Sequence, residues 1–260
     1  MKIAITGKGG VGKTTLSSVL CYLYRDEGKR VIAVDADPDA NLAGALGIPK
    51  EVAQKIRPIA ELTELIAERT GAKPGQMGGV FRLNPRVDDI PDEIGYRLDG
   101  IILLTIGKSK EAASGCYCPE NVFLRRLLKH LIVERDEVVI VDMEAGIEHL
   151  TRGTAEGVDA FIVVVEPGSR SIQTAMSVRD MAQGLGVKRV FVVGNKVRNE
   201  ADKDFIKENI HDMEIIGFIG FNHEIMEADI KGLSPYIHSP QAVGEIRLIK
   251  ETLDRRLRKS

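Results

Sequence analysis

A glycine-rich loop, with an expected strand before it and an expected helix after it, constrains the fold of this chain more than any other feature. Residues 7–15 read GKGGVGKTT and satisfy the pattern G-x-x-x-x-G-K-S/T of a phosphate-binding loop. The run at 2–6 is apolar and β-branched, as in a buried strand, and the run at 16–24 lacks Gly and Pro, as in a helix. A glycine-rich turn that binds nothing is the alternative, but pattern and context together favour nucleotide binding.

The motif assigns roles to two side chains of the loop and to its backbone. Glycines let successive N–H groups point at phosphate oxygens, and the next helix adds its N-terminal donors and positive dipole end. Lys13 is expected to reach the β- and γ-phosphates, and the Thr14 hydroxyl to bind Mg²⁺. The other residues expected to contact the nucleotide are Gly9, Gly10, Val11, Gly12 and Thr15.

Lys8 is a second lysine inside the loop. With it, the loop resembles the deviant Walker A loop of the MinD/ParA/nitrogenase iron protein class of ATPases. In that class the extra lysine reaches across a dimer interface to the nucleotide of the other subunit. The resemblance therefore implies a nucleotide-dependent homodimer, in which Lys8 and Lys13 both serve catalysis. The alternative is that Lys8 contacts only its own nucleotide or solvent.

Acidic residues follow the second expected strand, at 30–35. Residues 35–41 read DADPDAN and resemble the switch I segment of the same class. The resemblance implies that Asp37 orients the water that attacks the γ-phosphate. Asp35 or Asp39 could instead join the Mg²⁺ shell, and an ordinary acidic turn that caps a helix at 40–46 is a further alternative.

A second carboxylate of this kind ends the expected strand at 137–142. Asp142 resembles a Walker B aspartate, which holds Mg²⁺ through water, and it leads into a switch II segment that contains Gly146. Gly146 would let the backbone approach the γ-phosphate and move on hydrolysis. Glu144 could be a second catalytic carboxylate or an exposed residue of the switch.

Cys116 and Cys118 lie in a loop at 114–119, directly before a helix expected at 122–133, with Pro119 suited to its first turn. A helix N-terminus stabilises thiolate, the metal-binding form of cysteine. Two sulfurs are only half of a typical soft-metal site, and a two-fold dimer would bring four together. A labile redox pair and two ordinary thiols are the alternatives. Cys21, in the first expected helix, has the position of a core residue.

The dipeptide at Asn195 and Lys196 resembles the base-recognition dipeptide of the same class. Asn195 could donate to N7 of adenine and accept from its N6 amine. Guanine-specific sites use an N-K-x-D arrangement, whereas this chain continues with Val197 and Arg198. The sequence therefore favours ATP over GTP, although an asparagine in a strand–helix turn is the alternative.

Expected strands and helices alternate along all 260 residues, 43% of which are hydrophobic. This pattern predicts an α/β fold: a doubly wound, mostly parallel sheet of seven or eight strands with helices on both faces. We expect one P-loop ATPase domain over 1–260. Within it we expect a helix over 51–70 and an irregular insertion at 71–100, where 81–83 and 96–98 could pair as a hairpin.

The composition of the chain argues against two classes of binding partner, nucleic acids and membranes. The net charge of −2 gives no footprint for nucleic acid, and no apolar run is long enough for a membrane span. The three cysteines do not suggest a disulfide scaffold. The expected first strand begins at residue 2, so we expect no signal peptide. We therefore expect a soluble cytoplasmic protein without nucleic acid or membrane partners.

The motifs together resemble those of the CooC-like nickel-insertion ATPases, which mature carbon monoxide dehydrogenase. The resemblance extends over nearly the whole chain, and Cys116 and Cys118 before a helix are its most specific part. It implies a homodimer that binds ATP, Mg²⁺ and Ni²⁺, with Zn²⁺ as a competitor at the same sulfurs, and carbon monoxide dehydrogenase as the client. Alternatives are a MinD/ParA-type positioning or partition ATPase acting on membrane or DNA, a non-hydrolysing metal store and an iron–sulfur electron donor.

Overall fold

The sheet of this protein has strands from both halves of the chain at its centre. The computed structural model describes residues 1–74, 80–107, 119–144 and 152–258. Within them eight strands form one sheet in the order β3-β4-β2-β5-β1-β6-β7-β8, parallel throughout except for the antiparallel edge strand β3. The strands are β1 (Lys2–Thr6), β2 (Val31–Ala36), β3 (Tyr96–Leu98), β4 (Ile101–Thr105), β5 (Val138–Met143), β6 (Ala160–Val165), β7 (Val190–Val197) and β8 (Glu214–Gly220). The prediction of a mostly parallel sheet of seven or eight strands is confirmed.

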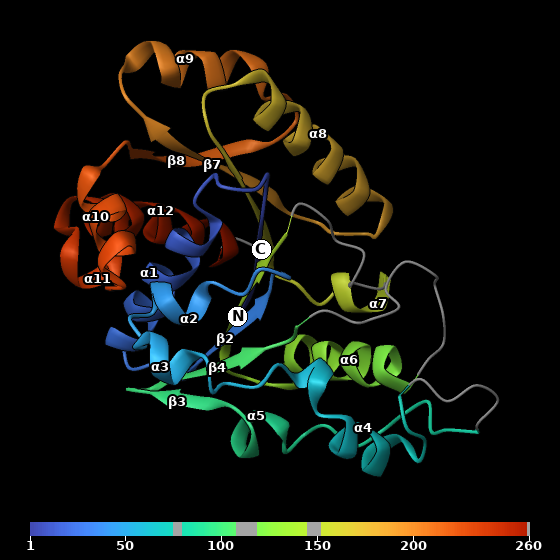
Figure 1. Ribbon diagram of the computed structural model, residues 1–260. Coiled ribbons are helices and arrows are strands. Elements are labelled where there is room, and N and C mark those ends of the chain that lie inside the picture. The colour runs from blue at the N-terminus through green and yellow to red at the C-terminus, as the bar shows by residue number, and fades with distance from the viewer. Residues whose placement is uncertain (75–79, 108–118, 145–151, 259–260) are drawn as a thin grey trace.

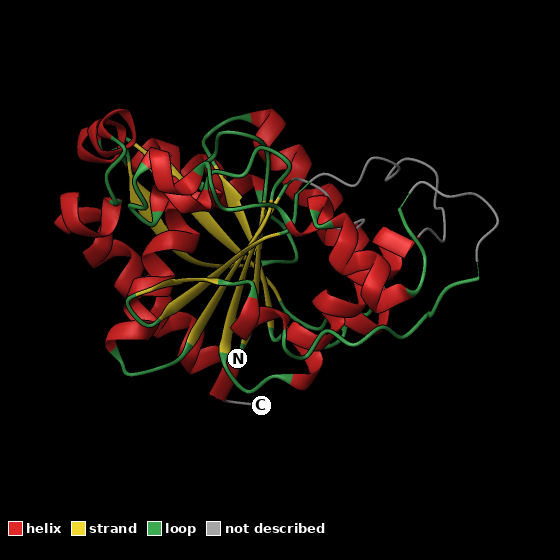
Figure 2. Cartoon of the chain, turned by 60° about the horizontal axis from the view of Figure 1, so that its bottom comes forward, coloured by secondary structure: helices red, strands yellow, loops and turns green. Residues whose placement is uncertain are grey.

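Helices cover both faces of this sheet (Figures 1 and 2). The helices are α1 (Lys13–Asp26), α2 (Leu42–Ala45), α3 (Lys50–Ala53), the 3₁₀-helix η1 (Ile59–Glu61), α4 (Thr63–Thr70), α5 (Ile90–Glu93), α6 (Pro119–Lys129), the π-helix η3 (His130–Glu134), α7 (Arg152–Ala155), α8 (Ser169–Gly184), α9 (Glu200–Asn209), α10 (His223–Lys231), α11 (Pro235–His238) and α12 (Pro240–Arg258). None of the helices in the described ranges combines the length and hydrophobicity that a bilayer span requires.

The strands are buried on both faces, which explains their unbroken apolar sequences. On one face, alternate strand residues such as Ile3 and Ile140 pack against α1 and α12. These helices contribute Leu16 and Ile246 to the contact. The residues between them face α4 and α6 near β2 and β4, and α8 and α9 near β6 and β7. The central strands therefore hold their C-terminal ends in fixed register between two apolar layers.

Two local predictions are wrong. The helix expected over 51–70 is broken into α3, η1 and α4, because Pro58 favours an extended residue before it and starts η1 with φ −58° and ψ 140°. The hairpin between 81–83 and 96–98 does not form: β3 pairs instead with β4 of the sheet, in the register Tyr96 to Leu103.

The insertion at 71–100 is therefore not irregular throughout its described part. It contains the short helix α5 and the edge strand β3. At the next helix, the expectation for Pro119 is confirmed, because α6 begins at that residue.

Candidate functional site

The loop between β1 and α1 has a backbone that glycine permits. Gly7, Gly10 and Gly12 have φ of 143°, 78° and 95°, which L side chains disfavour. A Cβ atom at Gly7 would lie 2.4 Å from the carbonyl oxygen of Val164, so the loop lies directly on the end of β6. Left-handed Gly12 starts α1 without a side-chain cap, which leaves the N-terminal N–H groups of α1 for an anion.

Lys13 lies under this loop and is only 5% exposed. Its Nζ donates to the carbonyl oxygen of Lys8 at 3.4 Å and lies 3.8 Å from Oδ2 of Asp37. The structure thus brings together two residues that sequence reasoning placed in catalysis, although they belong to different strand–helix connections. A buried ammonium group beside a phosphate cradle can offset charge on a triphosphate.

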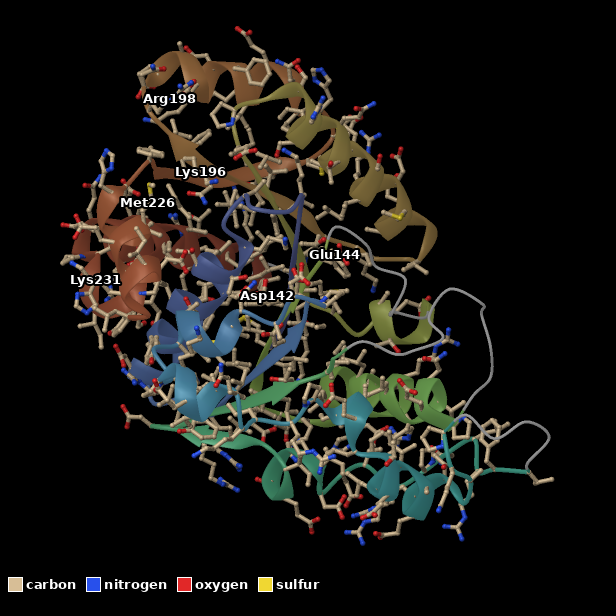
Figure 3. The ribbon with its side chains drawn as sticks, in the orientation of Figure 1. Asp142, Glu144, Lys196, Arg198, Met226 and Lys231 are labelled. Carbon is tan, nitrogen blue, oxygen red and sulfur yellow. The ribbon has the colours of Figure 1, made fainter. Side chains whose placement is uncertain are left out.

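Asp142 lies at the C-terminal end of β5, beside the loop (Figure 3). Burial raises the pKa of its carboxyl to about 6, although the Thr14 hydroxyl, the Lys13 charge and the Ser17 hydroxyl each lower it. Ser17 donates to Oδ1 at 3.2 Å, whereas Oδ2 is buried without a hydrogen-bond partner among the described residues. An orphaned carboxylate oxygen beside a threonine hydroxyl is a donor set that fits Mg²⁺.

Asp35 lies beside Asp142 in the sheet, because β2 and β5 pair in parallel with these two residues in register. Burial raises the pKa of Asp35 to about 7, and the nearby Asp142 charge adds to the increase. Both Asp35 oxygens accept backbone N–H groups, from Leu42 at 2.9 Å and from Asp37 at 3.3 Å. Asp35 therefore fixes the segment that carries Asp37, which leaves Asp142 better placed than Asp35 to hold a cation.

The side chain of Asn195, on β7, contacts the loop itself. Its Nδ2 donates to the carbonyl oxygen of Val11 at 2.6 Å, and its Oδ1 accepts from the backbone N–H of Lys196 at 2.8 Å. A Cβ atom at Gly12 would lie 2.1 Å from Nδ2. In this arrangement Asn195 braces the phosphate loop, and its contact with adenine stays a prediction.

Glu166, at this end of the sheet, was not predicted as a site residue, and neither was the contact of Lys196 with the phosphate loop. Glu166 follows β6, and its carboxylate lies within 3.5 Å of the ammonium groups of Lys8 and Lys196. Lys196 Nζ also donates to the carbonyl oxygen of Gly10 at 2.6 Å. The signal for Glu166 was available, because it ends an apolar strand as Asp142 does.

Three predicted residues lie outside the described part of the chain: Cys116, Cys118 and Gly146. Within the described part, no group of three or more His, Cys, Asp or Glu side chains could hold a metal ion. Glu144 is exposed, and its carbonyl oxygen accepts the Thr6 hydroxyl at 2.7 Å, which ties the start of the switch II segment to β1.

The sequence and the fold both match known proteins. The family described as CobQ/CobB/MinD/ParA nucleotide binding domain matches residues 2–236. The chain belongs to this family. The carbon monoxide dehydrogenase accessory protein CooC of Rhodospirillum rubrum is 49% identical over 240 residues, 92% of this chain and 91% of that protein. An uncharacterized ATP-binding protein of Methanocaldococcus jannaschii is 46% identical over 252 residues, 96% of each chain.

Solved structures show the same fold in this family. The MinC:MinD cell division protein complex of Aquifex aeolicus matches with a TM-score of 0.69 and 20% identity, over 100% of this chain and 96% of that chain. A ParA family ATPase of Chlorobium tepidum matches with a TM-score of 0.67 and 16% identity, over 97% and 98%. The predicted fold and the predicted class, an ATPase of the MinD/ParA type, are confirmed.

Proposed function

We propose that this ATPase is a dimeric metallochaperone that binds nickel through Cys116 and Cys118 and helps to insert it into carbon monoxide dehydrogenase. The convergence of Lys13, Asp37 and Asp142 on the phosphate loop carries the hydrolytic part of the proposal. The choice of client rests on the 49% identity to CooC.

The residues of the site divide the work of hydrolysis. Lys13 and the backbone N–H groups of the loop bind the β- and γ-phosphates, while Asp37 orients the attacking water. Asp142 and Thr14 hold Mg²⁺, which supplies positive charge to the phosphates. Lys8 of a second copy completes the site. In this arrangement Asp35 acts indirectly, through the backbone of Asp37.

Nickel is the cargo of this proposal rather than a resident cofactor. Cys116 and Cys118 of each copy would supply four thiolates on the two-fold axis of the dimer, and Zn²⁺ would compete for them. Hydrolysis would couple to metal delivery through the segments after Asp37 and Asp142.

Metal analysis tests the shared site. With ATP, the purified protein should bind one Ni²⁺ or Zn²⁺ ion per dimer, and Cys116→Ala should lose this metal. Cys21→Ala is the matched control, because Cys21 is fully buried in α1 and burial raises the pKa of its thiol. Unchanged metal content in Cys116→Ala, or one ion in each monomer, would contradict the shared site.

A MinD/ParA-type positioning function predicts a different result. It requires ATP-dependent co-sedimentation with liposomes or DNA, independent of Cys116. The likeness to MinD and ParA structures shows the shared fold, whereas the net charge of −2 offers little attraction to either surface.

A further inference from the structure

Glu166 holds one carboxylate between two lysines from distant parts of the chain. Lys8 Nζ lies 3.4 Å from Oε1, and Lys196 Nζ lies 3.5 Å from Oε2. Without Glu166 the two ammonium groups would lie near each other with no carboxylate between them. The carboxylate therefore makes this arrangement of the two lysines possible.

The position of Glu166 is fixed by its neighbours. Its backbone N–H donates to the hydroxyl of Ser171 at 3.0 Å, and Ser171 is buried in the first turn of α8. The phosphate loop is held against the same strand end, since Gly7 leaves no room for a side chain beside Val164. The phosphate loop and the Glu166 carboxylate are therefore both held at the C-terminal end of β6, which fixes the separation between them.

The two lysines differ in how firmly they are held. Lys196 Nζ also donates to the carbonyl oxygen of Gly10 at 2.6 Å. Lys8 Nζ has Glu166 as its one partner among the described residues, and its side chain is about as exposed as that of Lys196, at 40% and 42%. An exposed ion pair is weak, so a triphosphate with several negative charges can replace Glu166 as the partner of Lys8. Lys196 can stay on Glu166 and Gly10 while Lys8 leaves.

We propose that Glu166 is a positioning residue that holds Lys8 within its own chain until the ATP-bound dimer closes. Lys8 then leaves Glu166 for the phosphates bound by the second copy. This inference rests on the proposed dimeric function. The contact keeps the lysine ordered near its own loop and makes its transfer dependent on a partner's nucleotide.

Zero-length cross-linking with a carbodiimide tests the contact directly. The reagent joins a carboxylate and an amine that touch, with loss of water, and peptide mapping identifies the pair. The free protein should give both a Lys8–Glu166 and a Lys196–Glu166 product. With Mg²⁺ and AMPPNP, the Lys8–Glu166 product should fall at least about fivefold relative to the Lys196–Glu166 product as the dimer forms. With Mg²⁺ and ADP, the ratio should stay as in the free protein.

A second measurement separates positioning from a structural role. Glu166→Gln keeps the shape of the side chain but removes its charge. Lys8 then has no ion pair to leave before it reaches the phosphates of the second copy, so the ATP-dependent dimer should form at lower protein concentration. In a Lys8→Ala background the same substitution should have no such effect. An equal effect in both backgrounds would overturn the assignment, because Glu166 would then act on something other than Lys8.

The cross-links also separate this proposal from the proposed function. A dimer that keeps the Lys8–Glu166 product undiminished would overturn the transfer alone. Absence of that product from the free protein, while the Lys196–Glu166 product forms, would overturn the contact. A chain that stays monomeric with AMPPNP would overturn the dimeric function and the transfer with it.

Discussion

Strand β5 has a carboxylate at each end, and the two have opposite environments. Glu137, just before the strand, accepts two hydrogen bonds from the Arg135 guanidinium, which lower its pKa to about 2. Asp142, near the other end, has its pKa raised to about 6 by burial. These two residues, five positions apart, therefore have opposite pKa shifts, because one faces a guanidinium and the other is buried with an oxygen that has no hydrogen-bond partner among the described residues.

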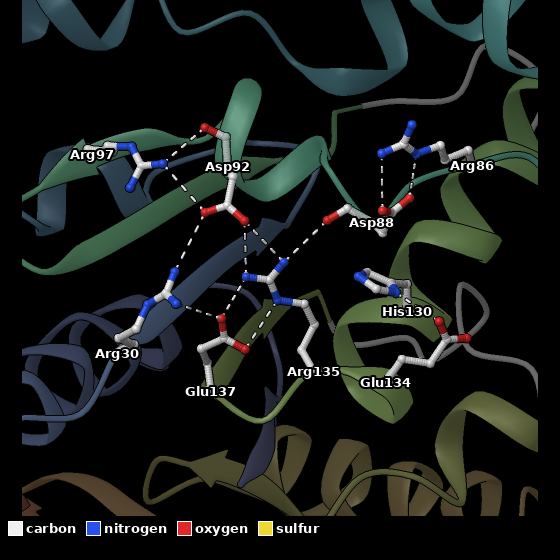
Figure 4. Close-up of polar contacts among 9 residues, drawn as sticks. All are labelled: Arg30, Arg86, Asp88, Asp92, Arg97, His130, Glu134, Arg135 and Glu137. Atoms are coloured by element: carbon white, nitrogen blue, oxygen red, sulfur yellow. Dashed lines mark hydrogen bonds and ion pairs between the residues drawn. The ribbon is translucent and has the colours of Figure 1, made fainter.

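The surroundings of Glu137 form a paired network (Figure 4). Arg135 also reaches Asp92 at 3.3 Å, and Asp92 in turn lies 3.6 Å from Arg30 and 3.4 Å from Arg97. These groups link β2, β3, α5 and β5 at the N-terminal side of the strands. Each charged group of this network has an opposite charge beside it, as is typical of a structural network.

At the other end of the sheet, neither Asp35 nor Asp142 forms an ion pair within the described part of the chain. Asp35 and Asp142 are both buried and lie in register, and the Asp142 charge adds to the raised pKa of Asp35. Such a pair destabilises the free protein at neutral pH unless a cation binds. The difference between the two ends indicates which charges are structural and which serve binding. Two substitutions and a change of pH test this distinction.

The largest effect is expected for Asp142→Asn. Loss of the Mg²⁺ ligand should lower ATP hydrolysis by about 100-fold or more. The free protein should become more stable by about 1–3 kcal/mol at pH 7, because the amide is not ionised. Steady-state phosphate release and chemical unfolding without nucleotide measure the two effects.

Loss of both stability and activity in Asp142→Asn would place Asp142 among the structural charges. Glu137→Gln is the control, because Glu137 lies just before the same strand. It should lose stability and keep its rate of hydrolysis.

Arg135→Gln should have an intermediate effect, on stability. The arginine side chain is 12% exposed, and its removal leaves Glu137 and Asp92 without their main partner. We expect the free energy of unfolding to fall by about 2 kcal/mol, with hydrolysis unchanged. Arg97→Gln is the matched control: it contacts the same Asp92 but is 62% exposed, so its effect should be below about 0.5 kcal/mol. Equal losses in the two variants would mean that burial does not determine the strength of this network.

The site residues that could be predicted are those with a local signal. The glycine loop and the aspartates that end β2 and β5 each lie next to an apolar run, so strand and site appear in one short window of sequence. Glu166 has the same signal and could have been found in this way. The contact of Lys196 with Gly10 could not, because it joins residues 186 positions apart and depends on a left-handed backbone at Lys196, with φ 57°.

The fold, too, could be predicted where the signal in the sequence is local and not where it depends on distant residues. Parallel strands were predictable because their apolar runs are unbroken, whereas the partner of β3 depended on the edge of the sheet rather than on its own three residues. For the segment at 51–70, the prediction of one helix gave the helical spacing of apolar residues more weight than Pro58. In the structure the proline governs the backbone at that point.

The smallest expected effect is a difference in pH dependence. A carboxyl with a raised pKa stabilises the folded chain fully below its ordinary pKa of 3.8, and Asp142 loses that contribution as the pH rises through about 6. Glu137 behaves in the opposite way: its contribution is present above 4.5 and is lost as the pH falls through about 2. From pH 5 to pH 7.5, the free wild-type protein should therefore lose about 1 kcal/mol more of its unfolding free energy than Asp142→Asn. Glu137→Gln should follow the wild type over this range, and parallel curves for wild type and Asp142→Asn would show that the buried carboxyl does not titrate there.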